Sequence, residues 1–170
     1  MNVRIQYWLD ADVYIQASRG PYKRFPEFWA FLDDQLRRGR IKSPKVVYGE
    51  LTKHWDDDLK KWCVNRKDIG LCVGPNREVQ QDCMGKIADY VYKTYLPHQS
   101  GEFLKGGDAW VIAHAMHGKN AGVVVTQESL RKFKSKIKLP TICKAMEVKY
   151  INTYDLLDAL DFKPENYRSK

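Results

Sequence analysis

Four acidic residues border apolar segments of the sequence, where a folded chain would bring them together. They are Asp10, Glu50, Asp108 and Glu128. Carboxylates are rarely buried unpaired, because the loss of hydration is costly or raises the pKa until the group is neutral. Four of them in one cleft would repel one another unless a divalent cation compensated their charge. Mg²⁺ and Mn²⁺ prefer carboxylate and water oxygens, so the residue types predict a metal site whose bound water becomes a nucleophile.

Two of these acids follow predicted buried strands. The segment 3–9 alternates between apolar and polar residues and then becomes apolar before Asp10. The valine run 122–126 ends at Thr126, two residues before Glu128. An apolar run that ends in an acid is typical of a buried strand that delivers a carboxylate. Functional groups gather at the carboxyl ends of parallel strands, so we expect the acids at that edge of the sheet.

The other two acids fall on predicted helices. Asp108 begins an apolar helix that extends to residue 116, and Glu50 lies in a helix for which Ser43 and Pro44 are an N-cap and first-turn pair. Ordinary roles are the alternative for each acid: a strand-end cap for Asp10, a helix N-cap for Asp108, a first-turn acid for Glu128, and an ion pair with Arg4 or Arg24 for Glu50.

The remaining segments continue this alternation of strands and helices. We predict helices over 26–36, 56–62, 79–95, around Cys143 and over 154–160, and short strands at 41 and 148–151. Strands separated by helices, with few hairpin signals, predict a parallel sheet with helices on both faces. The length of 170 residues fits one domain, here 1–162, followed by a frayed tail over 163–170.

Charge and composition restrict the partners and the compartment. The net charge of +8 on a chain with 44% hydrophobic residues favours a folded protein with a polyanionic partner over a disordered basic tail. The N-terminus does not resemble a signal peptide, and no run approaches the roughly 18–20 apolar residues of a membrane span. The four cysteines form no C-x-x-C pair. We therefore expect reduced thiols in a cytoplasmic protein that has no membrane partner.

Four segments together resemble the PIN-domain ribonucleases. Residues 7–15 are similar to the opening strand of that family, 43–51 to its second acidic motif, 107–115 to its third, and 123–128 to the strand that carries its fourth acid. The order and approximate spacing of these motifs cover nearly the whole chain. The resemblance implies an α/β/α sandwich with a central parallel sheet. It also implies a Mg²⁺- or Mn²⁺-dependent endoribonuclease that hydrolyses single-stranded or looped RNA, with Asp10, Glu50, Asp108 and Glu128 as catalytic residues and metal ligands.

Two positions depart from the family pattern, and the basic segment 131–138 with the run 138–143 indicates a divergent branch. Glu128 stands where aspartate is common, and Asp12 stands where asparagine or serine is common. We expect Asp12 to cap the following helix, the alternative being that it tightens the metal site. Thr126 supports the site by a hydrogen bond to an acid or to bound water, or is only a strand residue. Many stand-alone PIN domains of this size are toxins, which implies a cognate antitoxin, and relatives dimerise, here through the aromatic helix 25–36 as a candidate surface.

A basic segment after the fourth acid is expected to bind the RNA backbone. Its cations are Arg131, Lys132, Lys134, Lys136 and Lys138, for which a solvated face is the alternative. The opening motif also resembles haloacid-dehalogenase-type phosphatases, in which Asp10 would be the nucleophile and Asp12 the acid/base, but Glu50 would then be unexplained. A PIN-like module that binds RNA or protein without cutting is the third hypothesis. His114, on an apolar helix face, is expected to be a satisfied core histidine.

Overall fold

The computed structural model describes residues 4–20, 24–53, 57–117, 122–130 and 135–168. Its strands are β1 (Tyr7–Leu9), β2 (Ile41–Lys42), β3 (Val123–Val125) and β4 (Tyr150–Ile151). Its α-helices are α1 (Ala11–Arg19), α2 (Pro26–Arg37), α3 (Lys45–Lys53), α4 (Asp57–Val64), α5 (Met84–Thr94), α6 (Pro97–Lys105), α7 (Gly107–Met116), α8 (Leu139–Ala145) and α9 (Thr153–Ala159). Shorter helical turns are η2 (Lys67–Ile69), η3 (Val79–Cys83) and η4 (Pro164–Tyr167).

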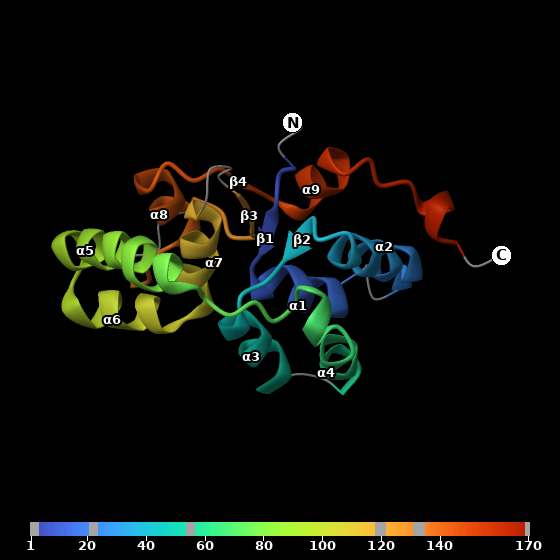
Figure 1. The fold of residues 1–170 in the computed structure, drawn as a ribbon, viewed down its shortest axis with the longest axis horizontal. Coiled ribbons are helices and arrows are strands. Elements are labelled where there is room, and N and C mark those ends of the chain that lie inside the picture. Colours follow the sequence, from blue (N-terminus) through green and yellow to red (C-terminus); the bar gives the residue numbers. More distant parts are fainter. Residues whose placement is uncertain (1–3, 21–23, 54–56, 118–121, 131–134, 169–170) are drawn as a thin grey trace.

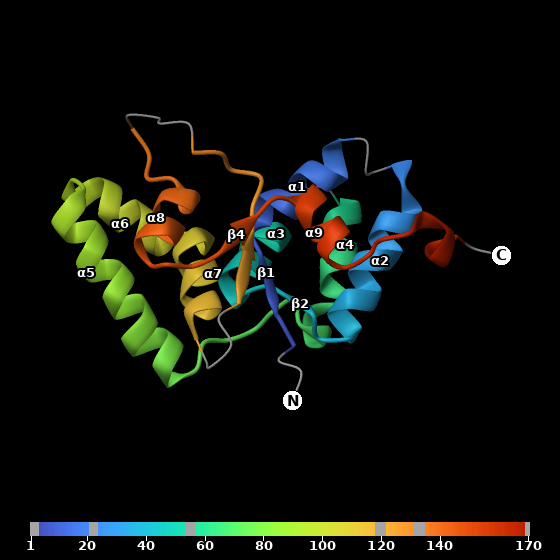
Figure 2. The ribbon, with the colours of Figure 1, turned by 90° about the horizontal axis from the view of Figure 1, so that it is seen from above.

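The strands form one parallel sheet in the order β2-β1-β3-β4. The central strands β1 and β3 are buried at every position, as expected for parallel strands that are covered on both faces. Helices α5 to α8 lie on one side of the sheet, and α1, α2, α4 and α9 lie on the other (Figures 1 and 2). The predicted α/β/α sandwich with a central parallel sheet is confirmed.

Two helices position the acidic residues relative to the sheet. Helix α7 packs against β1 and β3, and its buried residues include Ala109, Val111, Ile112 and Ala113. Helix α3 contacts both α1 and α7. The carboxyl end of the sheet therefore meets the start of α1, the start of α7 and one face of α3.

Ser43 has a different role from the predicted helix cap. Its buried hydroxyl donates to the carbonyl oxygen of Leu9 at 2.9 Å and lies 2.9 Å from the hydroxyl of Tyr14. Helix α3 begins two residues later, at Lys45. Because Ser43 follows β2 directly, its side chain meets the end of the neighbouring strand, so it ties β1 to the start of α3.

The C-terminal segment packs against α2 in place of the expected frayed tail. The Tyr167 hydroxyl donates to Asp34 Oδ2 at 3.1 Å, and the Phe31 ring lies 5.0 Å from Phe162 and 5.8 Å from Tyr167 between centroids. Phe28 and Phe31 are fully buried within the chain. The aromatic rings on the inner face of the helix are thus packed within the chain, and Phe25, which is 52% exposed, is the part of the predicted dimer surface that stays accessible.

The four cysteines are free thiols, as the sequence predicts. Burial raises the pKa of the Cys63 thiol to about 12, which keeps it protonated and unreactive. None of the described helices is long and apolar enough to cross a membrane.

Candidate active site

Asp10 lies at the carboxyl end of β1, where it begins α1. Its backbone N–H donates to the Val125 carbonyl oxygen at 3.0 Å, which continues the β1–β3 pairing by one residue. Its carboxylate is 4% exposed, and Oδ1 accepts a hydrogen bond from the Ala11 N–H at 2.7 Å. Asp10 is therefore the N-cap of α1, and the same geometry holds its carboxylate at the edge of the sheet.

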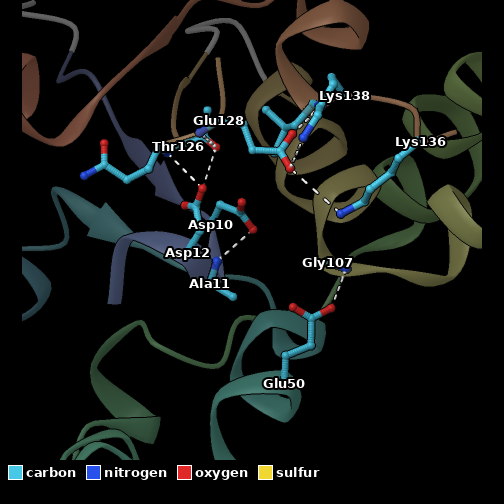
Figure 3. Close-up of polar contacts among 11 residues, drawn as sticks. Asp10, Ala11, Asp12, Glu50, Gly107, Thr126, Glu128, Lys136 and Lys138 are labelled. Atoms are coloured by element: carbon cyan, nitrogen blue, oxygen red, sulfur yellow. Dashed lines mark hydrogen bonds and ion pairs between the residues drawn. The ribbon is translucent and has the colours of Figure 1, made fainter. Parts of the chain in front are cut away.

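Asp12 joins the start of α1 to the end of β3. Its Oδ2 accepts from the Thr126 hydroxyl at 3.2 Å and from the Gln127 N–H at 3.0 Å (Figure 3). Thr126 is buried, and its Oγ1 accepts from the Glu128 N–H at 3.1 Å. The expectation that Asp12 caps the helix is wrong, since Asp10 performs that role. Thr126 hydrogen-bonds an acid, which is one of the two roles expected of it.

Glu50 projects from α3 toward the start of α7. Its Oε1 accepts a hydrogen bond from the Gly107 N–H at 2.7 Å, one of the donors that a helix N-terminus leaves unpaired. A Cβ atom at position 107 would lie 2.9 Å from Val47 Cγ2 and about 3.0 Å from the Glu50 oxygens, so only glycine fits. This backbone contact, and not the alternative arginine, holds Glu50 beside Asp108. In the sequence, the glycine directly before Asp108 was the signal for this contact.

The carboxylate of Glu128 contacts a neighbouring segment, although its charge still reaches Asp108 and Asp12. Its Oε2 accepts from the Leu139 N–H at 3.1 Å, and its Oε1 lies 3.6 Å from Lys138 Nζ and 3.9 Å from Lys136 Nζ (Figure 3). Two of the five predicted RNA-binding cations thus reach the acidic site. The other three, Arg131, Lys132 and Lys134, lie outside the described residues.

The acids share one electrostatic environment. Burial raises the pKa of Asp10 well above its ordinary value, and Asp108, Asp12 and Glu50 raise it further. Burial also raises the pKa of Asp12. At Asp108, burial and the charge of Glu128 raise the pKa to about 6, although Lys136 partly offsets them. The folded chain therefore holds these carboxylates close together at an electrostatic cost.

A cavity of about 380 Å³ opens beside these acids. Its lining includes Glu50 and Asp108, Phe103 of α6, and Lys136 and Ile137. Its size falls within the range of about 300–1,000 Å³ that is typical of ligand sites. The cavity gives a substrate access to the acids, with one ammonium group at its wall.

The donor atoms fit a hard divalent cation in their chemistry. All are carboxylate oxygens, and Asp12 Oδ1 is buried without a hydrogen-bond partner. Among the described residues, no three acidic, histidine or cysteine side chains already stand at metal-binding spacing. Hydrogen bonds from Gly107 and Leu139 already engage one oxygen of each glutamate, although the charges of both glutamates still raise the pKa of Asp108. A cation would therefore meet the aspartates first.

His114 is a core residue, as expected, but it is not fully satisfied. It is 5% exposed and stacks on Trp8 with centroids 4.5 Å apart, and its Nε2 is buried without a hydrogen-bond partner. Burial lowers its pKa to about 4, so the ring is neutral near pH 7. His114 is therefore a packing residue of α7.

Comparison with known proteins supports the fold. The sequence model of a family described as a domain of unknown function (DUF4411) matches residues 7–164. No curated protein matches the sequence. Among solved structures, the chain is similar to the crystal structure of VapBC2 from Rickettsia felis bound to a DNA fragment from their promoter, with a TM-score of 0.51 and 13% identity over 87% of this chain and 98% of that chain. At this identity the likeness shows the fold alone, and it agrees with the PIN-like α/β/α arrangement.

Proposed function

This chain belongs to the DUF4411 family, a domain of unknown function, and we propose that it is a metal-dependent endoribonuclease that hydrolyses phosphodiester bonds of single-stranded or looped RNA. The observation that carries the proposal is the group of aspartates at the carboxyl end of the sheet, of which Asp10 is buried and Asp12 and Asp108 are partly buried. Asp10, Asp12 and Asp108 all have a raised pKa, and burial is the largest cause for each. A Mg²⁺ or Mn²⁺ ion compensates such a group.

The metal would be held by the aspartates, with Glu50 beside it. When bound, it supplies activation of the attacking water and stabilisation of charge on the phosphate and the leaving oxygen. The Ala11 N–H fixes Asp10, and the Gly107 N–H fixes one oxygen of Glu50, which leaves the other to orient the attacking water. The positioned carboxylates thus define the point of hydrolysis before substrate arrives.

RNA is the proposed substrate because of the charge around this acidic site. The chain has 29 basic and 21 acidic residues, so the surface away from the site is strongly basic. Lys136 lines the cavity next to Asp108, and its side chain is 64% exposed. Lys136 and Lys138 would contact backbone phosphates on either side of the cleaved bond.

A cognate antitoxin is the proposed protein partner. The similar structure is of a VapBC2 assembly bound to DNA from their promoter, and the resemblance to stand-alone PIN toxins points to the same kind of pairing. A small antitoxin-like reading frame adjacent to the gene would support this role. Homodimerisation and a cytoplasmic location stay predictions.

The phosphatase alternative gains no support from the geometry. It needs Asp12 as an acid/base directed at the substrate, and the hydrogen bonds from Thr126 and Gln127 to Oδ2 leave only Oδ1 for that role. It also leaves the contact between Glu50 and Gly107 without a purpose.

An RNA cleavage assay with Mg²⁺ or Mn²⁺ tests the proposal. We expect cleavage by the wild type, loss of cleavage with a chelator, and loss in Asp10→Asn and Asp108→Asn. Asp89→Asn is a matched control, because Asp89 is an exposed acid on α5 that pairs with Lys93. The nuclease proposal is wrong if the chelator and both site substitutions leave cleavage unchanged. Release of phosphate from a small phosphoester without RNA cleavage would support the phosphatase, and metal-independent RNA binding without cleavage would support the non-catalytic module.

A further inference from the structure

We infer that Asp12, and not Glu128, is the acid that completes the metal site with Asp10, Asp108 and Glu50. Glu128 instead anchors residues 136–139 beside the site. The inference rests on the proposed function, because it concerns the metal of the same site.

The side chain of Glu128 is already engaged within the chain. Its Oε2 accepts from the Leu139 N–H at 3.1 Å, and its Oε1 faces the ammonium groups of Lys138 at 3.6 Å and Lys136 at 3.9 Å. Its negative charge is therefore compensated without a metal. An aspartate at position 128, one methylene shorter, would not reach the Leu139 N–H from the same backbone. The length of this side chain suits an anchor of the segment that leads into α8.

Asp12 has the opposite arrangement. Two donors, the Thr126 hydroxyl and the Gln127 N–H, fix Oδ2, while Oδ1 is buried without an N–H or hydroxyl donor and the carboxyl group contacts that of Asp10. A buried polar atom left unpaired is costly and calls for a ligand or water that satisfies it. Because two bonds restrict the side chain to one orientation, the free oxygen is held in place before any ligand binds.

The position of Asp12 relates this free oxygen to the other aspartates. Asp10 and Asp12 lie side by side at the start of α1, whereas Glu128 turns toward Lys136 and Lys138 (Figure 3). A cation beside Asp10 would meet Oδ1 of Asp12 and would displace only the contact between these two carboxyl groups. Coordination by Glu128 would instead require that its Leu139 hydrogen bond and two ion pairs be disrupted.

Mn²⁺ titration of RNA-free protein by calorimetry, together with thermal denaturation without metal, tests the inference. We expect Asp12→Asn to weaken Mn²⁺ binding by about 10- to 100-fold, the range found when a metal site loses a supporting group. We expect Glu128→Gln to keep Mn²⁺ affinity within about 2-fold, because the amide oxygen of the new side chain still accepts from the Leu139 N–H, while the metal-free melting temperature falls with the loss of both ion pairs. Asp89→Asn is the control for removal of one acidic charge.

Lys138→Met provides a second test that does not depend on the folding of Asp12→Asn. If Glu128 bound the metal, removal of a competing ammonium group would tighten Mn²⁺ binding; we expect no change beyond about 2-fold. Two results would overturn the inference and leave the proposed function standing. One is tighter Mn²⁺ binding in Lys138→Met, and the other is a loss of Mn²⁺ affinity in Glu128→Gln but not in Asp12→Asn. Failure of the folded wild type to bind Mn²⁺ overturns both the inference and the proposed function.

Discussion

Two groups of aspartates in this chain have opposite surroundings. On α2, Asp33 pairs with Arg37 at 2.8 Å and with Arg66 at 2.7 Å. Burial raises the pKa of Asp33, but these arginines more than offset it and leave the pKa below its ordinary value. At the edge of the sheet, burial and neighbouring acids raise the pKa of Asp10 and Asp108.

The difference shows which group of acids has its negative charge compensated by cations of the same chain. The α2 acids have cations from the same chain, so their ion pairs are structural. The acids at the sheet edge destabilise the folded chain, and under the proposed function a divalent cation from outside would compensate them. Such a trade of stability against function is common at active sites, and it lets variants in the two regions be told apart by opposite effects.

The largest expected effect is on catalysis. Asp108→Asn should reduce RNA cleavage by about 10²-fold or more, as expected for loss of a group that stabilises the transition state. The same substitution removes a charge from an acidic cluster, so the metal-free protein should melt at a higher temperature than the wild type. Cleavage rates and thermal denaturation with chelator measure both. A variant with less activity and a lower melting temperature would contradict the comparison, because it would indicate simple damage to the fold.

The next effect is on the pH dependence of stability without metal. The pKa of Asp108 is about 6 in the folded chain against an ordinary value of 3.8, so its proton is held more tightly when folded. Its contribution is therefore greatest below pH 3.8 and is lost as the pH rises through 6, a change of about 2–3 kcal/mol. His114 acts in the opposite direction, because its pKa falls to about 4 and stability is gained as the pH rises toward 6.5.

A comparison of two proteins separates these contributions. The wild type and Asp108→Asn both contain His114, so its effect cancels when urea denaturation of the two proteins is compared at pH 5 and pH 7.5. The remaining difference in the free energy of unfolding reports Asp108. We expect the wild type to lose stability relative to the variant as the pH rises, and saturating Mn²⁺ to reduce that loss. An unchanged difference between the two proteins at both pH values would show that Asp108 is not perturbed by its neighbours.

A smaller effect is expected on α2. Arg66 pairs with Asp33, and its guanidinium lies 4.4 Å from the centroid of the Trp62 ring. Arg66→Met should lower the free energy of unfolding by about 1–2 kcal/mol and leave the cleavage rate of the folded protein unchanged. Urea denaturation and the cleavage assay measure these, with Arg77→Met as the matched surface control. A loss of specific activity would mean that the two regions are coupled.

The smallest effect concerns substrate binding. Lys136→Met should weaken binding of single-stranded RNA modestly and reduce the salt dependence of log affinity by about 0.7, the contribution of one phosphate contact. Fluorescence anisotropy at several salt concentrations, in the Asp10→Asn background to prevent cleavage, provides the measurement. An unchanged salt dependence of log affinity would show that Lys136 pairs with Glu128 and makes no phosphate contact.

The fold and the principal acids could be predicted because their signals are local. An apolar run that ends in Asp10, or in Thr126 and Glu128, indicates both a buried strand and the edge at which it stops. The sheet then brings these ends together, since neighbouring parallel strands share their direction.

The contacts that separate one acid from another could not be predicted in the same way. The pattern of Ser43 and Pro44 matches a helix cap, but the Ser43 hydroxyl reaches Leu9, 34 residues earlier. The engagement of Glu128 by Leu139 depends on the course of the loop between them, for which sequence spacing gives no measure. Side-chain partners across long separations follow from packing, and packing is specified by the whole fold.

The contact between the C-terminal segment and α2 has a consequence for synthesis of the chain. Phe31 is translated early, but its partners Phe162 and Tyr167 lie about 130 residues later. At translation rates of about 5–20 residues per second, Phe31 waits about 7–26 s for the rings that cover it. During that interval the face of Phe31 that these rings cover has not met its partners, so we expect this part of the domain to be completed only after the C-terminal segment has been made.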